Sequence, residues 1–415
     1  MVKFKAITAT SLALMLAGVA GAASAADDLR VRLDLGANYN WAQSNTIDAA
    51  LGFAQRYSAN AGVRFMLKGG EGAWRYQVHW QLTFDVGDNV GFDRALAGMF
   101  ASPPPPSLFD LNGVVYGDAN TKISNNIDRL SLSYTSDNFV VRIGRQALTW
   151  GAGLVFKPGD IIAPFAPNAV ERTYKPGVDM LYGQYLFDNG ADLEAVFVPR
   201  RKVAGGAFDW SSSTLALHSN ILLGDLDGAI MLARDRGDTV LNLSLGGPLG
   251  GMVWNAQVGQ WLLSDGSYPT TFVANISGLG TFAGKNITYF AEYFHNGFGV
   301  APNTPLDALP MSLSTRLSTG QLFNAGRNFV ALGGQINLTP DIIFSPSVIV
   351  SLDDASVFGA LQARWSLSDD ADLIFSASKG FGNPGSEFGG RETSAGSGIY
   401  LAPAGAASVG FTRYF

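Results

Sequence analysis

Apolar and polar residues alternate along many stretches of the chain. In residues 73–86, AWRYQVHWQLTFDV, every second residue from Trp74 to Val86 is apolar and the residues between them are polar. Residues 29–41 follow the same rule. A period of two places alternate side chains on opposite faces of a β-strand, so each stretch predicts a strand with one apolar and one polar face. These strands are longer than the five or six residues of a typical soluble strand, and their length suits a tilted crossing of a bilayer.

The same rule predicts eighteen strands along the chain. The pattern is weakest in the strands at 213–221 and 270–280, so sixteen strands is the alternative. The predicted fold class is all-β, a transmembrane antiparallel β-barrel formed by residues 26–415. The predicted ranges are 28–41, 57–68, 73–86, 126–136, 138–147, 176–187, 190–199, 213–221, 225–234, 238–246, 251–262, 270–280, 286–298, 327–338, 341–352, 355–367, 370–380 and 407–415.

The connections between these strands alternate between short and long. The short ones are rich in Gly, Asn, Asp and Pro, the residues of tight hairpins. Outer-membrane barrels have short periplasmic turns and long extracellular loops, and an even strand number puts both termini on the short-turn side. A soluble β-sandwich would also alternate, but the repeated strand length and the aromatic residues at strand ends favour the barrel. The long connections are 42–56, 87–125, 148–175, 200–212, 299–326 and 381–406.

Residues 1–25 have the pattern of a signal peptide: two lysines, an apolar run and a small-x-small site at Ala23-Ser24-Ala25. No later window of eighteen apolar residues exists, which excludes transmembrane helices. The chain has no cysteine, so an exported protein of this sequence is stabilised without disulfides, as a closed sheet can be. The predicted location is the outer membrane of a Gram-negative bacterium. The acidic pI of about 5.1 and the lack of a basic cluster argue against nucleic acid as a partner.

A barrel of sixteen to eighteen strands encloses a lumen, so inward residues are the functional candidates. Alternation places seven basic residues on the inward faces of the first five strands, against Asp34 and Asp85. Such a wall would favour anionic solutes. The alternative is a merely polar interior in which the arginines pair with acidic residues of the loops. The predicted pore-lining residues are Arg30, Arg32, Arg64, Lys68, Arg75, Arg129 and Arg142; the opposite wall adds Glu194, Asp227, Glu292 and Arg364.

The long connection 148–175 is too apolar for a freely solvated loop and contains three prolines that fix turns. We expect it to fold into the lumen and narrow the pore; a rigid surface flap is the alternative. The segment 87–125, with prolines at 103–106, is the competing constriction, although its proline run is more typical of a stiff exposed spacer. The residues predicted at the constriction are Arg145, Trp150, Lys157, Asp160, Glu171, Arg172 and Lys175.

Gly144-Arg145-Gln146, followed by Trp150-Gly151, resembles the GRQ-containing strand and loop of outer-membrane channels related to the alginate-export group. The resemblance covers about residues 129–186. It implies a single-chain barrel of eighteen strands with an arginine-rich lumen that passes anionic or other polar solutes, and it carries over to Arg142, Arg145 and Gln146. Alternation points Arg145 outward, so either a bulge turns it inward or it lies at the membrane interface.

The C-terminal VGFTRYF, 409–415, resembles the terminal-strand signal that the bacterial barrel-assembly machinery reads. It departs from that signal because Arg413 stands in the usual aromatic position and Tyr414 follows it. Further predicted partners are outer-membrane lipid, lipopolysaccharide and a polar small-molecule or oligomeric solute.

The sequence predicts neither an enzyme nor a cofactor or metal site. His218 and Ser219 are adjacent on a strand, so their side chains point to opposite faces and cannot cooperate. No stretch has metal-ligand spacing. The predicted function is passive diffusion of polar, anionic solutes past a constriction at 148–175. Two alternatives stay open: a dedicated export or uptake channel with envelope partners, and a closed barrel with adhesive or structural loops.

Overall fold

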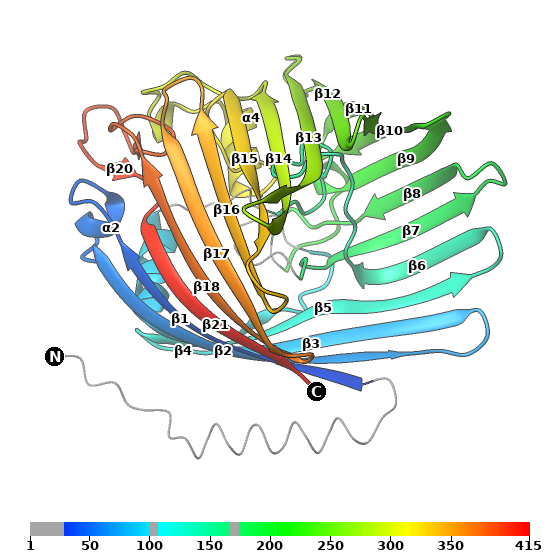
Figure 1. Ribbon diagram of the computed structural model, residues 1–415, viewed down its shortest axis with the longest axis horizontal. Coiled ribbons are helices and arrows are strands. Elements are labelled where there is room, and N and C mark those ends of the chain that lie inside the picture. The colour runs from blue at the N-terminus through cyan, green and yellow to red at the C-terminus, as the bar shows by residue number, and fades with distance from the viewer. Residues whose placement is uncertain (1–28, 100–106, 166–173, 204) are drawn as a thin grey trace.

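The computed structural model describes residues 29–99, 107–165, 174–203 and 205–415. The predicted signal peptide and the prolines at 103–106 lie outside these residues. Nineteen strands form one antiparallel sheet that curls until its first and last strands pair (Figure 1). Strand β4 pairs only with β5, and the other eighteen strands form a closed barrel. The predicted fold class and strand number are therefore confirmed.

The barrel strands are close to the predicted ranges, and the two weakest predictions, now β9 and β13, are both present. The eighteen strands are β1 (Leu29–Trp41), β2 (Gln55–Gly69), β3 (Trp74–Gly87), β5 (Thr121–Thr135), β6 (Phe139–Gln146), β7 (Val178–Leu186), β8 (Asp192–Val198), β9 (Thr214–Leu223), β10 (Leu226–Asp235), β11 (Asp238–Leu249), β12 (Met252–Leu262), β13 (Thr270–Phe282), β14 (Lys285–Asn296), β15 (Asn328–Asn337), β16 (Ile342–Ser351), β17 (Val357–Ser368), β18 (Ala371–Phe381) and β21 (Gly405–Tyr414).

The barrel closes where β1 pairs with β21, from Arg32 opposite Tyr414 to Trp41 opposite Gly405. Trp41 lies flat against Gly405: an added Cβ there would be 2.2 Å from the indole ring. At the other end of the seam the hydroxyl of Thr412 donates to Asp34 at 2.8 Å. The seam therefore combines backbone pairing with side-chain contacts between the two strands.

Strand β5 begins at Thr121, five residues before its predicted start at 126. Its extra length is paired by β4 (Gly113–Gly117), which lies beside β5 beyond the point where β6 ends. A strand edge needs such a partner because its backbone groups are otherwise unpaired. The sequence TKISNN at 121–126 alternates poorly, so the pattern gave no signal for this extension.

The long connections carry short elements that gather at one end of the barrel (Figure 1). The C-terminus lies at the other end. No helix of the described residues is long and apolar enough to cross a membrane. The elements are α2 (Ile47–Ala50), α3 (Asp88–Met99), η1 (Trp210–Ser212), η2 (Leu306–Ala308), α4 (Met311–Ser318), β19 (Arg391–Glu392) and β20 (Tyr400–Leu401).

Hydrogen bonds to carboxylates tie these loops together. Asp353, in the β16–β17 turn, accepts from the amides of Arg327 and Asn328 at 2.8 and 2.9 Å. Burial acts to raise the pKa of Asp353, but these bonds and one from the Asn328 side chain outweigh it and hold this pKa below its ordinary value. Glu387 makes the same kind of contact with the amides of Ala325 and Gly326, each at 2.9 Å.

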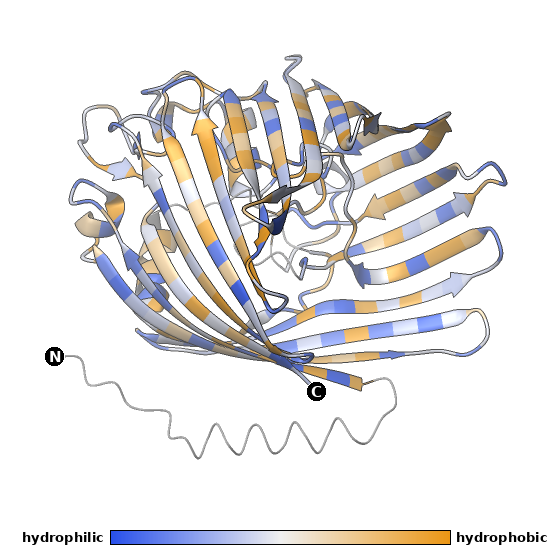
Figure 2. Cartoon of the chain, in the orientation of Figure 1, coloured by the Kyte–Doolittle hydropathy of each residue, from blue (hydrophilic) through white to orange (hydrophobic). Residues whose placement is uncertain are grey.

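The two faces of the wall differ in hydropathy, and Figure 2 shows apolar and polar residues alternating along the strands. Large apolar side chains such as Leu132, Ile143, Leu361 and Phe375 are exposed on the outward face. Inward side chains are polar near the short turns. At the loop end they pack with residues of 148–165, 299–326 and 381–404 into one buried apolar cluster between β7 and β17. The lumen at that end is therefore partly filled.

Candidate functional site in the barrel lumen

The segment 148–165 leaves β6 and turns into the barrel, and its glycines permit the close turns. Gly151 has a φ of +101°, a left-handed conformation that favours glycine. At Gly153 an added Cβ would lie 1.7 Å from the carbonyl oxygen of Phe156, so no other residue fits this backbone. Gly159 approaches the wall so closely that a Cβ would be 2.0 Å from the Gln257 side chain on β12.

Glu292, on β14, holds the middle of this segment against the opposite wall. Its carboxylate accepts three backbone N–H bonds, from Leu154 at 2.5 Å, Val155 at 2.9 Å and Phe156 at 2.7 Å. Asn275, on β13, donates to Glu292 at 3.1 Å and to the carbonyl of Ala152 at 2.9 Å. Charge-assisted bonds of this kind are stronger than neutral ones. The segment therefore spans the lumen from β6 to β14.

Aromatic contacts fix both ends of this crossing. Phe156 stacks on Phe294 with ring centroids 4.6 Å apart. Trp150 stacks on His218 of β9 at 5.0 Å. The indole N–H of Trp150 donates to Glu194 of β8 at 2.6 Å, and the hydroxyl of Tyr182 donates to the same carboxylate at 2.7 Å. Aromatic pairs add to the stability that burial alone gives.

A buried ion pair closes the base of the segment. Lys175 lies 2.5 Å from Asp160 and also donates to the carbonyl of Leu148 and, at 3.0 Å, to the hydroxyl of Thr149. Both charged groups are almost fully buried. Burial raises the pKa of Asp160 and lowers the pKa of Lys175, while each partner acts against that shift in the other. The pair fixes residues 148–160 to the start of β7.

Tyr174, next to this pair, reaches the basic wall. The guanidinium of Arg64 lies 3.5 Å from its ring centroid and that of Arg129 lies 4.8 Å away. The Tyr174 hydroxyl bonds His79 of β3. Cation–π contacts with desolvated guanidinium groups are stabilising. One tyrosine thus joins the loop to three inward residues of β2, β3 and β5.

The strand register places all seven predicted pore-lining residues on one face of β1 to β6. Two of them are neutralised: Arg32 lies 2.8 Å from Asp34, and Arg64 pairs with Asp128. Arg129 donates to the Lys175 carbonyl at 2.8 Å. The other contacts are Arg142 with Gln146 at 3.3 Å and Arg75 with the carbonyl of Gly72 at 2.8 Å.

Within the described part of the chain, five of these residues have no carboxylate within 4.0 Å: Arg30, Lys68, Arg75, Arg129 and Arg142. Their positions follow the predicted alternation, although a bulge interrupts the register between β3 and β5 at His79. Their part in selectivity stays a prediction. Pairing has reduced the net positive charge of the wall from what the sequence alone suggests.

Arg145 does not join the contacts of the constriction residues. It shares the outward face of Ile143, which is 57% exposed, yet Arg145 itself is only 2% exposed. Asp179 on β7 binds its guanidinium at 2.7 and 3.1 Å, and residues 109–112 cover it through the Phe109 carbonyl at 2.8 Å and Asn112 at 3.2 Å. The Arg145 side chain therefore ties strand β7 and residues 109–112 to the wall, and its place at the constriction stays a prediction.

The other predicted constriction residues divide into two groups. Trp150, Lys157, Asp160 and Lys175 lie in or beside the lumen segment, and Glu171 and Arg172 lie outside the described residues. The residues that sequence reasoning missed as anchors are Glu194, Gln257, Asn275 and Glu292. Glu292 and Glu194 were expected only as lumen charges. A carboxylate at an inward position of an apolar strand, as in TYFAEYF at 288–294, was the available signal.

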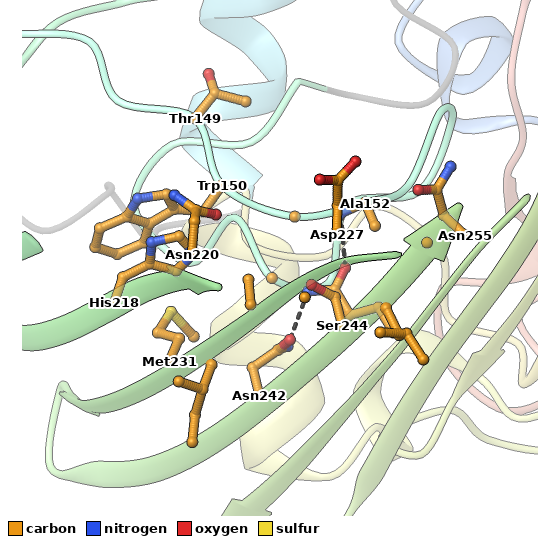
Figure 3. Close-up of a pocket in the computed structure, with 18 of the residues that line it drawn as sticks. Thr149, Trp150, Ala152, His218, Asn220, Asp227, Met231, Asn242, Ser244 and Asn255 are labelled. Atoms are coloured by element: carbon orange, nitrogen blue, oxygen red, sulfur yellow. Dashed lines mark hydrogen bonds between the residues drawn. The ribbon is translucent and has the colours of Figure 1, made fainter. Parts of the chain in front are cut away.

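Two cavities lie between this segment and the short turns. One, of about 340 Å³, is bounded by Trp150, Gly151 and Gly159 of the segment and by β8 to β12 (Figure 3). The other, of about 710 Å³, touches Val155 and is lined by strands β14 to β18, β21 and β1. Both are in the size range of small-molecule pockets. The arrangement can hold or pass a small polar solute.

The sequence matches no protein-family model and no curated protein. Solved structures with a similar fold include OccK5 (OpdH) of Pseudomonas aeruginosa, with a TM-score of 0.55 and 8% identity over 94% of this chain and 98% of that one. OccAB1 of Acinetobacter baumannii has a TM-score of 0.53 and 10% identity, over 94% and 96%. Wzi of Escherichia coli, a carbohydrate-binding outer-membrane β-barrel involved in group 1 capsule assembly, has a TM-score of 0.54 and 11% identity, over 99% and 90%. The chain therefore has the fold of these outer-membrane β-barrels.

Proposed function

We propose that the protein is an outer-membrane channel for passive diffusion of polar solutes, narrowed by residues 148–165. The observation that carries the proposal is the crossing of the lumen by this segment, which is bound to Glu194, Gln257, Asn275 and Glu292 on the far wall. A segment that served only as a surface flap would need none of these contacts. The polar cavities on its turn side provide room for a solute.

The proposed location is the outer membrane of a Gram-negative bacterium, which the protein reaches through its N-terminal signal peptide. The outward apolar face would contact lipid and lipopolysaccharide, as in other barrels of this kind. The terminal strand β21 would be recognised by the barrel-assembly machinery. The similarity of the fold to OccK5, OccAB1 and Wzi supports this location.

We further propose that small anions pass more readily than small cations. The inward face of β1 to β6 carries basic side chains that no described carboxylate neutralises, and Arg129 and Arg142 lie near the base of the lumen segment. Fixed positive charge at a narrow, poorly screened position favours anions. The preference should be modest, because Arg32 and Arg64 are paired.

Recording of ion currents through the purified, folded protein in a planar bilayer tests the channel. Conductance above that of the bare membrane is expected, and a reversal potential in a KCl gradient should show anion preference. Arg129→Gln and Arg142→Gln should reduce that preference, whereas Arg234→Gln, a matched change on the outward face of β10, should not. Cation preference in the wild type would refute the anion proposal and leave the channel intact.

One observation favours a second candidate, a closed barrel whose loops serve adhesion or surface structure. The apolar cluster formed by 148–165, 299–326 and 381–404 fills the loop end of the lumen next to β7 to β17. If this cluster sealed the barrel, the folded wild-type protein would show no conductance, and only the variant that lacks residues 152–164 would conduct ions. The channel proposal expects conductance from both proteins, with the larger value from the deletion.

A further inference from the structure

The smaller lumen cavity lies against β9 to β12, away from the basic residues of β1 to β6, and its wall is lined by small residues. Its floor is the inner face of β9 to β12, and its roof is the backbone of residues 149–152 together with Gly159. Ala229, Ser244 and Gly246 occupy the centre of the floor, so the wall is hollow where larger side chains would meet the roof. Figure 3 shows the side chains of Asn220, Asn242 and Asn255 around this hollow. The volume of about 340 Å³ is thus a consequence of small residues on both sides.

Amide side chains dominate the polar lining. Asn220, Asn242, Asn255 and Gln257 each present a carbonyl oxygen and an NH₂ group, so they can accept and donate hydrogen bonds. The Nδ2 group of Asn242 is buried and has no hydrogen-bond partner, although Asn242 Oδ1 accepts from Gln257 at 2.6 Å. This donor is covered on the side of Gly259, whose added Cβ would lie 3.0 Å from it, so a molecule in the cavity would bond the other amide groups of the lining.

Charge around the cavity excludes an anionic ligand. None of the described residues that line it is Lys or Arg, and the two carboxylates are Glu194 and Asp227. The Glu194 carboxylate already accepts from Trp150 and Tyr182 and lies 3.0 Å from His218. Asp227 is the remaining acceptor of full charge and is exposed. An anion would meet no Lys or Arg among the described lining residues, and it would lie close to the carboxyl groups of Glu194 and Asp227.

Because the lining offers many neutral donors and acceptors, a ligand with several hydroxyl groups matches it best: each hydroxyl both donates and accepts. The stacked rings of Trp150 and His218 form one end of the cavity and offer an apolar surface. We propose that this cavity is a binding site for an uncharged sugar ring. The site names neutral solutes rich in hydroxyl groups as one substrate class of the proposed channel. Its role in solute passage rests on that proposed function.

The site also separates two properties of the lumen. The basic side chains on β1 to β6 act on small ions, whereas the amides on β9 to β12 would select by hydrogen bonding. An uncharged sugar interacts only weakly with the basic side chains of β1 to β6. Ion selectivity at that wall and sugar binding at β9 to β12 can therefore be independent. Loss of anion preference should therefore leave sugar binding unchanged.

Equilibrium binding to the full-length, detergent-solubilised protein, measured by calorimetry, tests the proposal with three probes that share one ring: glucose, glucosamine and glucuronate. Glucose should bind, and glucuronate should bind on the order of tenfold more weakly or not at all. Ser244→Leu fills the floor of the cavity and should weaken glucose binding by at least about tenfold. Ser347→Leu, the same change in the larger cavity, should leave it within about twofold.

Three results would overturn the sugar site. They are no glucose binding to folded protein, equal loss in Ser244→Leu and Ser347→Leu, and tighter binding of glucosamine that Asp227→Asn abolishes, which would show a cation site. The readout does not depend on conductance. Glucose binding without conductance would refute the channel proposal and support the sugar site. Conductance without glucose binding would refute the sugar site and support the channel proposal.

Discussion

Removal of the Glu292 carboxylate should release the segment that crosses the lumen. Glu292→Ala deletes the acceptor of three backbone N–H bonds from Leu154, Val155 and Phe156. Each hydrogen bond to a charged group contributes about 1.5–3 kcal/mol, so the three together contribute at most about 9 kcal/mol. Water can reach the freed amides once the segment moves, and the stacking of Phe156 on Phe294 remains. We therefore expect a loss of about 5 kcal/mol in docking free energy.

A loss of this size multiplies the undocked fraction by on the order of 10³ to 10⁴. Two measurements report it. Hydrogen exchange of the peptide that covers residues 151–162 should lose protection by a comparable factor, because the segment opens locally while the barrel stays closed. Single-channel recording should show a larger or more frequently switching conductance, since the undocked segment no longer spans the lumen.

Two further variants make this experiment specific. Glu292→Gln keeps the oxygen that accepts from Val155 and Phe156 and should give an intermediate loss of protection. Asp227→Ala removes another inward carboxylate, one that makes no hydrogen bond or ion pair to the described residues 148–165, and should leave the segment docked. Wild-type exchange and conductance in folded Glu292→Ala would show that the segment is held by packing alone, and would refute the reasoning.

Three other changes test separate contacts. Lys175→Met should leave Asp160 buried and unpaired and destabilise the segment by about 3–5 kcal/mol, whereas the double change with Asp160→Asn should recover most of the loss; proteolysis of the loop in folded protein measures both. Arg145→Lys cannot keep the two-pronged bond to Asp179 and should lower the midpoint of thermal unfolding, with a cost of about 1–3 kcal/mol; an unchanged midpoint would count against it. Since the pKa of Asp353 is lower in the folded protein, its bonds stabilise the loops above the unfolded value of about 3.9 and lose this effect as the pH falls through the folded value. At pH values below about 4, the amides of Arg327 and Asn328 should therefore lose protection from hydrogen exchange, and Asp353→Asn should remove this pH dependence.

The barrel could be predicted because its main determinant is local. Each strand repeats a period of two, and the hairpin residues lie next to the strands they connect, so no knowledge of distant contacts was needed. The register even keeps the seven basic residues on one face across the bulge at His79. The prediction failed where local pattern is absent, as at the start of β5, whose partner β4 comes from another part of the same connection.

The site was harder to predict because its contacts join residues far apart in sequence. Glu292 accepts a hydrogen bond from the amide of Phe156, 136 residues away, and no local sequence pattern in either stretch indicates this contact. Arg145 shows the same limit: alternation left its direction open between a bulge and the membrane interface, and its burial depends on residues 109–112, which pack over it. A charged side chain at an outward position predicts solvent or membrane interface unless a distant segment covers it.

The seam between β1 and β21 has a consequence for biogenesis. Asp34 and Thr412 meet across 378 residues, so the wall cannot become continuous until the whole chain is present. Until then the nascent sheet has two open edges, each a template for pairing with other chains. In the closed barrel Trp41 packs on Gly405, where an added Cβ would lie 2.2 Å from the indole ring. Replacement of Gly405 by a larger residue should therefore impair closure of the barrel before it has any effect on the closed protein.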